Sequence, residues 1–304
     1  MRIAAEMEVD KPRAIRLISH AVEATKTRWS QYDRTWRDID RIFIHHGYEQ
    51  GGFEIFKFLP LLDKRECYSI RALGSILREE DGPSYVRDSA GSLTRPFYVA
   101  LSHGERGDRG RALYDAITDF QRPGGGRAGA FFWKLIWYIL TSCRYLANNH
   151  SASFRSYMLA TFAKHIGKQL IRDEELLSLV PEDWTRFVEK TRPWEPLKGI
   201  GRNTFDFIFG DLVEARFAQD LYKLDAANLH FLRVTGISDL IGDLDRPNVI
   251  SFVRDLGTGH TLRQVNKGIY TYCSVTESGS YGFCRSLEDC KRCAVAVDCA
   301  KKLR

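Results

Sequence analysis

Four cysteines in the last part of the sequence constrain this chain more than any other feature. They are spaced Cys284-x5-Cys290-x2-Cys293-x5-Cys299, and charged residues surround them, so this segment has little apolar surface of its own. A C-x2-C pair places two thiolates within one turn, and the flanking cysteines complete a shell of four sulfur ligands. Soft, anionic sulfur suits an iron–sulfur cluster or zinc, so the spacing predicts a metal site that supplies the fold of the segment.

The other cysteines help to define the compartment. Cys273 is an alternative ligand, although ten residues separate it from Cys284, and we expect Cys67 and Cys143 to be ordinary core thiols. Five of the seven cysteines lie between Cys273 and Cys299, whereas a secreted disulfide framework distributes its cysteines through a small domain. We therefore expect a reducing cytoplasm, with association with the nucleoid if the source is prokaryotic.

Composition sets the range of partners. With 304 residues, 44% of them hydrophobic, the chain can bury one large core or two modest ones. The net charge is +6 and charges of both signs are mixed, which favours a folded basic face that binds a polyanion. Residues 1–12 lack the apolar run of a signal peptide, and the most apolar window, 128–143, contains Lys134 and is too short to span a bilayer. No membrane partner is expected.

A glycine-containing turn at residues 197–202 is the second candidate for a functional element. Its sequence is Leu-Lys-Gly-Ile-Gly-Arg, and an apolar stripe with helical spacing follows at Phe205, Ile208, Phe209 and Leu212. Two glycines let the backbone turn tightly and present its N–H groups at a helix N-terminus, which suits a phosphate. A plain helix–helix turn is the alternative, since glycine is common in such turns.

Three motifs, taken in order, resemble the helix-hairpin-helix DNA glycosylase superfamily in its endonuclease III-like branch. The turn at 197–202, the pair Leu224-Asp225 before a further helix, and the cysteine run follow one another as they do in that branch. The resemblance covers roughly residues 128–304. It implies a mainly α, two-lobed fold whose C-terminal loop holds a [4Fe–4S] cluster on the four cysteines. It also implies a monomer that binds double-stranded DNA with one base flipped out of the stack.

By this resemblance Asp225 is the catalytic carboxylate, which stabilises the oxocarbenium-like sugar and orients the attacking water as the N-glycosidic bond breaks. An aspartate before Ala-Ala-Asn-Leu is also a routine helix N-cap, and Asp206 and Asp220 are weaker candidates for the carboxylate. Where bifunctional members have a nucleophilic lysine, this chain has Asn203, whose amide cannot form a Schiff base. We therefore expect a monofunctional glycosylase that removes a damaged, mispaired or modified base and leaves an abasic site.

The same resemblance assigns contacts with DNA. In the turn they are expected at Lys198, Gly199, Ile200, Gly201, Arg202 and Asn203. Arg144 follows an apolar helix predicted at 131–141, where it is expected to fill the gap left by the flipped base, to bind a phosphate or to cap the helix. The alternative function is a non-catalytic protein that binds DNA through the same turn and metal segment, with an affinity that depends on salt.

The pattern of the sequence changes near residue 125. Residues 1–125 are expected to be an extra region that selects the substrate or a partner, 126–270 the helical glycosylase core, and 271–304 the metal segment. Within the first part, a helix is predicted from Pro12 with Asp10 as its cap, followed by β-like runs at 41–44, 53–58 and 97–100. Within the second, helices are predicted at 131–140, 154–166, 174–180 and 184–190.

Two further features of the first part are expected to lie outside the site. His45 and His46 suggest a metal or acid–base pair, but adjacent residues on a strand point to opposite faces, so a surface or core position is favoured. Arg106, Arg109 and Arg111 are either phosphate contacts or solvated loop charges.

Overall fold

The computed structural model describes residues 9–48, 55–78, 95–123, 125–126, 130–275, 277 and 281–303. Within these ranges the regular structure is helical, with no β-strand and a single isolated parallel bridge between Arg34 and Leu212. The prediction of a mainly α protein is therefore confirmed. The chain divides into two compact units, which we call the terminal unit (1–34 and 209–304) and the central unit (35–208).

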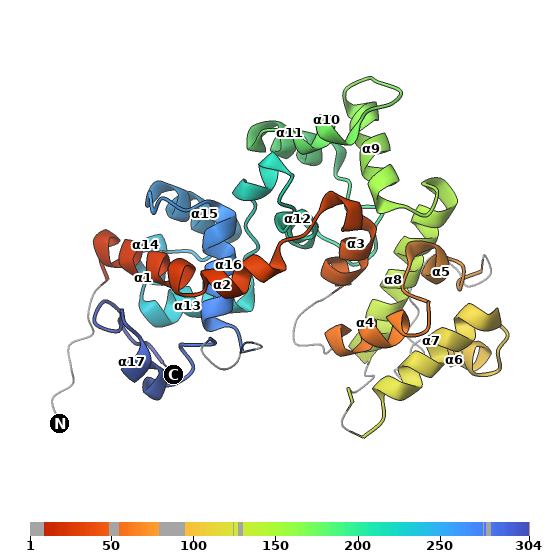
Figure 1. Ribbon diagram of the computed structural model, residues 1–304, viewed down its shortest axis with the longest axis horizontal. Coiled ribbons are helices and arrows are strands. Elements are labelled where there is room, and N and C mark those ends of the chain that lie inside the picture. The colour runs from red at the N-terminus through yellow and green to blue at the C-terminus, as the bar shows by residue number, and fades with distance from the viewer. Residues whose placement is uncertain are drawn as a thin grey trace. The chain divides into compact units, whose positions relative to one another are not determined.

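The terminal unit is formed by both ends of the chain. Its first helix, α1 (Lys11–Ala24), packs along α16 (Leu262–Cys273), and α16 also contacts α13 (Ala226–Thr235) (Figure 1). The remaining helices and 3-10 turns are α2 (Lys26–Trp29), η1 (Ser30–Tyr32), η4 (Arg216–Asp220), α14 (Ser238–Ile241), α15 (Arg246–Asp255) and α17 (Leu287–Arg292).

Local sequence explains how α1 begins and how it packs. Asp10 is the N-cap, as predicted, because its carboxylate accepts a hydrogen bond of 3.0 Å from the backbone N–H of Arg13, and Pro12 fits the first turn. The buried face of α1 meets α16 at Gly268, where a Cβ would lie only 2.6 Å from the Cα of Val22. A glycine at this position allows the two backbones to approach closely.

The central unit is built around aromatic side chains. Phe120 stacks on Phe132 at 4.9 Å between ring centroids, and both rings meet the edge or face of Phe58. Its helices are η2 (Trp36–Asp38), α3 (Ile39–Tyr48), α4 (Ile55–Asp63), α5 (Ile70–Gly74), α6 (Arg95–Ser102), α7 (Gly107–Phe120), α8 (Ala130–Asn149), α9 (Phe154–His165), α10 (Asp173–Leu177), α11 (Pro181–Thr191) and most of α12 (Arg202–Gly210).

The β-like runs predicted in the first part of the chain are wrong. Residues 41–44 lie in α3, 55–58 in α4 and 97–100 in α6, while 53 and 54 fall outside the described residues. A run of four to six apolar residues has no measurable period, so it fits a buried helix face as well as a strand. In α3 the buried positions include Ile39, Ile42 and Phe43, which is the spacing of a helix.

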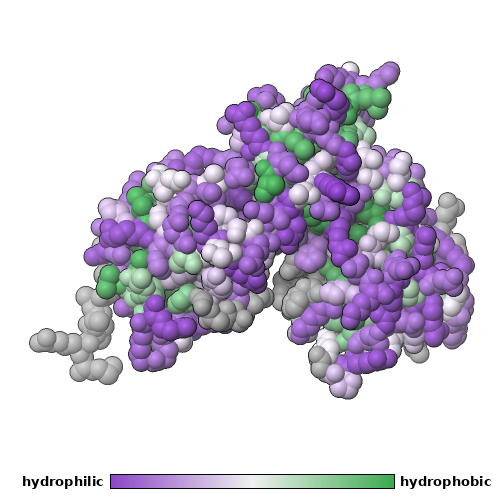
Figure 2. All heavy atoms as spheres, in the orientation of Figure 1, coloured by the Kyte–Doolittle hydropathy of each residue, from purple (hydrophilic) through white to green (hydrophobic). Residues whose placement is uncertain are grey.

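The later helices occur where the sequence predicted them, although their exact bounds differ. Helices occur at all four predicted positions, as α8 to α11, and Pro181 opens α11 as expected. The expected limits at 125 and 270, however, fall inside the central and the terminal unit respectively. Among the described helices none combines the length and the apolar composition needed to cross a membrane. The face shown in Figure 2 is mainly hydrophilic over the described residues.

Candidate functional site

Asp225 lies at the N-terminus of α13, in the terminal unit. Its Oδ1 accepts a hydrogen bond of 2.8 Å from the backbone N–H of Asn228, so the aspartate is the N-cap of the helix, and the residue is half-buried. Gly236 ends the helix in a left-handed conformation with φ 84°. The N-terminus of α13 therefore presents a carboxylate, as both the capping and the catalytic interpretation of Asp225 require.

Two buried side chains extend from this carboxylate. The side-chain amide of Asn228 donates to the same Oδ1 at 2.9 Å, and the hydroxyl of Tyr222 donates to the amide oxygen of Asn228 at 2.6 Å. Asn228 and Tyr222 are both fully buried. Burial, and then the charge of Asp225, raise the pKa of Tyr222 far above its usual value, so its hydroxyl remains a donor.

The backbone just before Asp225 is held by helices α15 and α16. The side chain of Asn266 accepts from the N–H of Lys223 at 3.3 Å and donates to its carbonyl at 2.8 Å. The guanidinium of Arg246 donates to the carbonyl of Tyr222 at 3.1 Å. Three consecutive backbone polar groups are thus bonded to side chains, which fixes the direction from which the chain enters α13.

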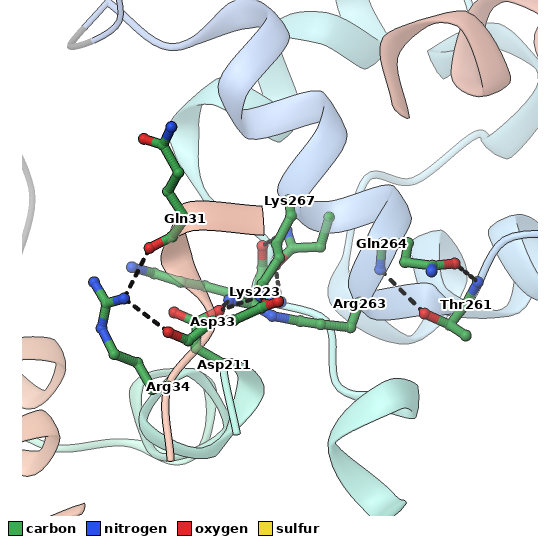
Figure 3. A network of polar contacts seen from close by, with 10 residues as sticks. Gln31, Asp33, Arg34, Asp211, Lys223, Thr261, Arg263, Gln264 and Lys267 are labelled. Carbon is green, nitrogen blue, oxygen red and sulfur yellow. Dashed lines mark hydrogen bonds and ion pairs between the residues drawn. The ribbon is translucent and has the colours of Figure 1, made fainter. Parts of the chain in front are cut away.

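A buried ionic network begins at Arg263, which contacts Asn266, and continues to Asp211 and Lys267 (Figure 3). Arg263 donates to Asn266 at 2.6 Å and forms a salt bridge with Asp211. Lys267 lies 3.2 Å from Asp211 and 2.8 Å from Asp33. The side chains of Arg263, Lys267 and Asp211 are only 6%, 6% and 4% exposed. Charges at this depth are tolerated because they are paired.

Sequence reasoning missed this network, although α16 carries a signal for it. Arg263, Asn266 and Lys267 occupy positions i, i+3 and i+4 of a helix whose neighbouring positions, such as Val265 and Ile269, are buried and apolar. Polar side chains in a row on a buried helix face need partners, so the row itself points to an internal polar site.

The turn at 197–202 lies in the central unit, where helices α3 and α8 support it. Gly199 has φ 78°, and a Cβ there would come within 2.3 Å of the ring of Tyr138. The hydroxyl of Tyr48 donates to the carbonyl of Lys198 at 3.2 Å, and Ile200 is buried with its Cδ1 3.0 Å from a Cβ built on Gly47. Residues of the expected extra region therefore form part of the base of the turn.

The outer side of the turn is open. Lys198, Gly199 and Gly201 are exposed, and a Cβ added to Gly201 would meet no described atom within 4 Å. Asn203, in the first turn of α12, is half-buried. A ligand backbone has room to approach Gly201, which is the property that the phosphate-binding interpretation requires.

Arg202 and the two weaker carboxylate candidates, Asp206 and Asp220, form ion pairs inside the protein. Arg202 donates from Nε to the buried carboxylate of Asp206 at 2.9 Å and lies 5.5 Å from the centre of the Trp194 ring. Arg202 is therefore oriented by the protein itself, and Asp206 is its counter-ion. The other minor carboxylate candidate, Asp220, pairs with Arg254 at 2.7 Å. These pairings leave Asp225 as the better candidate of the three aspartates.

Arg144 does not follow the end of a helix, contrary to the prediction. Helix α8 continues to Asn149, so Ser142, Cys143 and Arg144 lie within it, and the guanidinium donates to the backbone carbonyl of Arg78. The helix continues because its later turns also pack in the core: a Cβ on Gly74 of α5 would lie 2.6 Å from the carbonyl oxygen of Cys143.

His45 and His46 lie in α3, so the argument from a strand is wrong. His46 is 6% exposed and its ring stacks on Phe207 at 4.4 Å. A core position is therefore correct for His46, for a different reason than the one expected. Among the arginines of the same region, Arg106 and Arg111 pack over the rings of Phe97 and Tyr114.

The four cysteines of the predicted metal site lie in the terminal unit, beside the end of α13. Cys299 lies 3.7 Å from the carbonyl of Val234, while His230, one turn earlier, lies 2.8 Å from the carbonyl of Cys284. All the cysteines are free thiols, and the Cys273 thiol shares a hydrogen bond with Cys284. The helix that begins at Asp225 therefore ends against the cysteine segment.

Burial and the neighbouring thiols determine the electrostatics of the cysteine segment. Burial is the first cause that raises the pKa of Cys299, to about 11, and Cys284, Cys290 and Cys293 contribute in the same direction. A bound metal has the opposite effect on a cysteine, because it takes the thiolate as its ligand. In the described residues, however, no three His, Cys, Asp or Glu side chains are arranged around a common metal position.

No protein-family model, no curated protein and no solved structure matches this chain.

Proposed function

We propose that the chain is a monofunctional DNA glycosylase that hydrolyses the N-glycosidic bond of a flipped base. The observation that carries the proposal is the carboxylate of Asp225. One of its oxygens caps α13, while the other, Oδ2, accepts no hydrogen bond from any residue within the described ranges. A fixed carboxylate with one open oxygen can stabilise a positively charged sugar and orient a water molecule beside it.

In this proposal the turn of the central unit binds the DNA backbone. The exposed Gly201 directly precedes α12, so a phosphate there would meet the N-terminus of that helix, and the exposed side chain of Lys198 adds a positive charge. Asn203 replaces a nucleophilic amine, so the strand remains intact after the base is released.

Cys284, Cys290, Cys293 and Cys299 would hold an iron–sulfur cluster, with zinc as the alternative and Cys273 as a neighbouring thiol. Four thiolates suit either metal. The group would cross-link a polar segment that docks on α13, where the backbone of Ala300 donates to the carbonyl of Thr235 at 3.0 Å. Purified protein of yellow-brown colour with stoichiometric iron supports the cluster, whereas stoichiometric zinc without colour supports the alternative.

The deciding experiment incubates the protein with duplex oligonucleotides that carry damaged, mismatched or heavily modified bases, and identifies released bases by mass. We expect wild type to release at least one base and leave an uncleaved abasic strand. The Asp225→Asn variant retains a side chain that can cap α13 but loses the charge, so base release should fall by roughly a hundredfold or more. If wild type binds distorted duplex tightly and releases nothing, the protein is a non-catalytic DNA-binding protein.

The DNA contact has its own test, the variant Gly201→Ala. Since the added methyl group meets no described atom within 4 Å, the thermal stability should not change. If a phosphate approaches this position, the methyl group should weaken duplex binding by about 1 kcal/mol, roughly fivefold in Kd. Unchanged affinity would show that DNA does not contact the turn at Gly201.

A further inference from the structure

The pair Tyr222 and Asn228 forms a hydrogen-bonded chain that ends on one oxygen of Asp225. From the hydroxyl of Tyr222 the chain runs 2.6 Å to the amide oxygen of Asn228, and from the amide nitrogen 2.9 Å to Oδ1 of Asp225. The backbone N–H of Asn228 reaches the same Oδ1 at 2.8 Å. The N-cap role alone needs only this last bond.

The chemistry of the three groups allows only one direction for the chain. An ionised carboxylate only accepts hydrogen bonds, so the end of the Asn228 amide that faces Asp225 must be the NH₂ group. The oxygen of the amide then faces Tyr222, whose hydroxyl must donate to it. Burial and the charge of Asp225 raise the pKa of that hydroxyl, which keeps it a donor.

Burial holds both side chains of this hydrogen-bonded chain, and further contacts hold the backbone of Tyr222. Tyr222 and Asn228 are fully buried, and the carbonyl of Tyr222 accepts the bond from Arg246. Asn266 holds both backbone groups of Lys223, the residue that follows Tyr222. Full burial restricts the rotation of both side chains, so the carboxylate that Asn228 contacts is held in one orientation.

We propose that Tyr222 and Asn228 are positioning residues that lock Oδ1 of Asp225, so that Oδ2 alone faces the sugar and the attacking water. This inference rests on the proposed glycosylase function. Fixing the reacting oxygen before the substrate binds avoids reorganisation in the transition state and leaves ground-state binding of DNA unaffected.

The main test is the variant Tyr222→Phe, which removes one hydroxyl and keeps the ring. Its matched control is Tyr157→Phe: the hydroxyl of Tyr157 is also buried and donates over 2.6 Å, but to the carbonyl of Pro193 in the central unit. The two variants should lose similar stability. On the duplex that wild type cleaves best, Tyr222→Phe should lower kcat by roughly tenfold at unchanged KM, and Tyr157→Phe should leave kcat within about twofold.

The variant Asn228→Asp supplies a second measurement. It replaces the donating NH₂ group by an acceptor next to Asp225 and keeps the backbone N–H that caps the helix, so kcat should fall by more than it does in Tyr222→Phe. Equal kcat values for wild type, Tyr222→Phe and Asn228→Asp, with Asp225→Asn inactive, overturn the inference and leave the proposed function standing.

A readout without substrate separates the two proposals. In NMR spectra the side-chain amide protons of Asn228 should exchange slowly in wild type and faster in Tyr222→Phe, with no change in Tyr157→Phe. If wild type releases no base, the glycosylase proposal fails. The exchange rate of the Asn228 amide still decides whether Tyr222 and Asn228 orient Asp225. Fast exchange in wild type shows that the amide is not locked, and the inference is then wrong.

Discussion

Among the described residues, the terminal unit buries ten polar or charged side chains, whereas the central unit buries three, His46, Ser142 and Asp206. The central unit fills its interior with aromatic rings such as the Phe120–Phe132 stack. The terminal unit instead places Arg263, Lys267 and Asp211 within its interior. The two units therefore differ in the kind of interaction that determines how their side chains are arranged.

This difference has a consequence for the candidate site. Aromatic packing is strong but tolerates small shifts, because dispersion and burial have little directional preference. Buried hydrogen bonds and ion pairs have narrow geometric requirements, and they are costly when they are not met. The terminal unit carries Asp225, whose proposed role depends on the orientation of one carboxylate. The central unit carries the turn, for which a firm base is sufficient.

The largest expected effect comes from removing the anion at the centre of the network. The variant Asp211→Ala leaves Arg263 and Lys267 buried without their shared partner, and breaking a buried pair in this way costs about 3–5 kcal/mol. The measurement is urea unfolding followed by circular dichroism. The matched control is Asp33→Asn, which removes the second partner of Lys267. Because the side chain of Asp33 is 42% exposed, this variant should cost about 1 kcal/mol or less. If both variants lose the same stability, the network is not what orders this unit.

In the central unit the corresponding variant is Gly199→Ala. The φ of 78° costs about 1–2 kcal/mol for any residue with a Cβ, and the methyl group would clash with Tyr138 at 2.3 Å. We expect a loss of roughly 2–4 kcal/mol in total, together with weaker DNA binding. Gly201→Ala is the control for stability. If Gly199→Ala and Gly201→Ala had equal thermal stability, the left-handed conformation of Gly199 in the turn would be contradicted.

How far the sequence predicted these units depends on the range of the interactions. The cap at Asp10, the helix at 154–166 and the N-terminus at Asp225 depend on residues within one or two turns, and their helices occur as predicted. The runs at 41–44 and 97–100 were predicted as strands because a short apolar run has no readable period. Which helix covers such a run is decided by tertiary packing.

The candidate site shows the same limit. Asp225 and the turn were identified by motif, but the partners of the site come from distant parts of the sequence. Asn266 lies 43 positions from Lys223, and Arg263 lies 52 positions from Asp211. Such pairs cannot be identified from a single sequence. The polar residues on the buried face of α16 show that partners are needed, but they do not show which residues these partners are. The contact between Tyr48 and the carbonyl of Lys198, which supports the turn, was missed for the same reason.

The smallest expected effect concerns the contact that links α1 to the cysteine segment, and it appears only in acid. Arg16 donates to both oxygens of Asp298, at 2.6 and 3.1 Å, and these bonds hold the pKa of that carboxyl below its usual value of 3.8. Because the pKa is lower in the folded state, the stabilisation is present above the unfolded value and is lost as the pH falls through the folded one. The variant Arg16→Gln should therefore unfold at a slightly higher pH in an acid titration, while its Tm at neutral pH changes by about 1 °C or less.

Arg186→Gln is the control for this measurement, because Arg186 forms an exposed pair with Asp183 in the central unit at 2.9 Å. No change in its acid transition is expected, since exposed pairs of this kind contribute little. A difference between the two variants would show that the terminal unit also uses a directional ionic contact at its surface, where α1 meets the segment that holds the cysteines. Identical acid transitions would confine the ionic character of the terminal unit to its interior, around Asp211, and would leave the hydrogen bonds to α13 as the contacts that hold the cysteine segment in place.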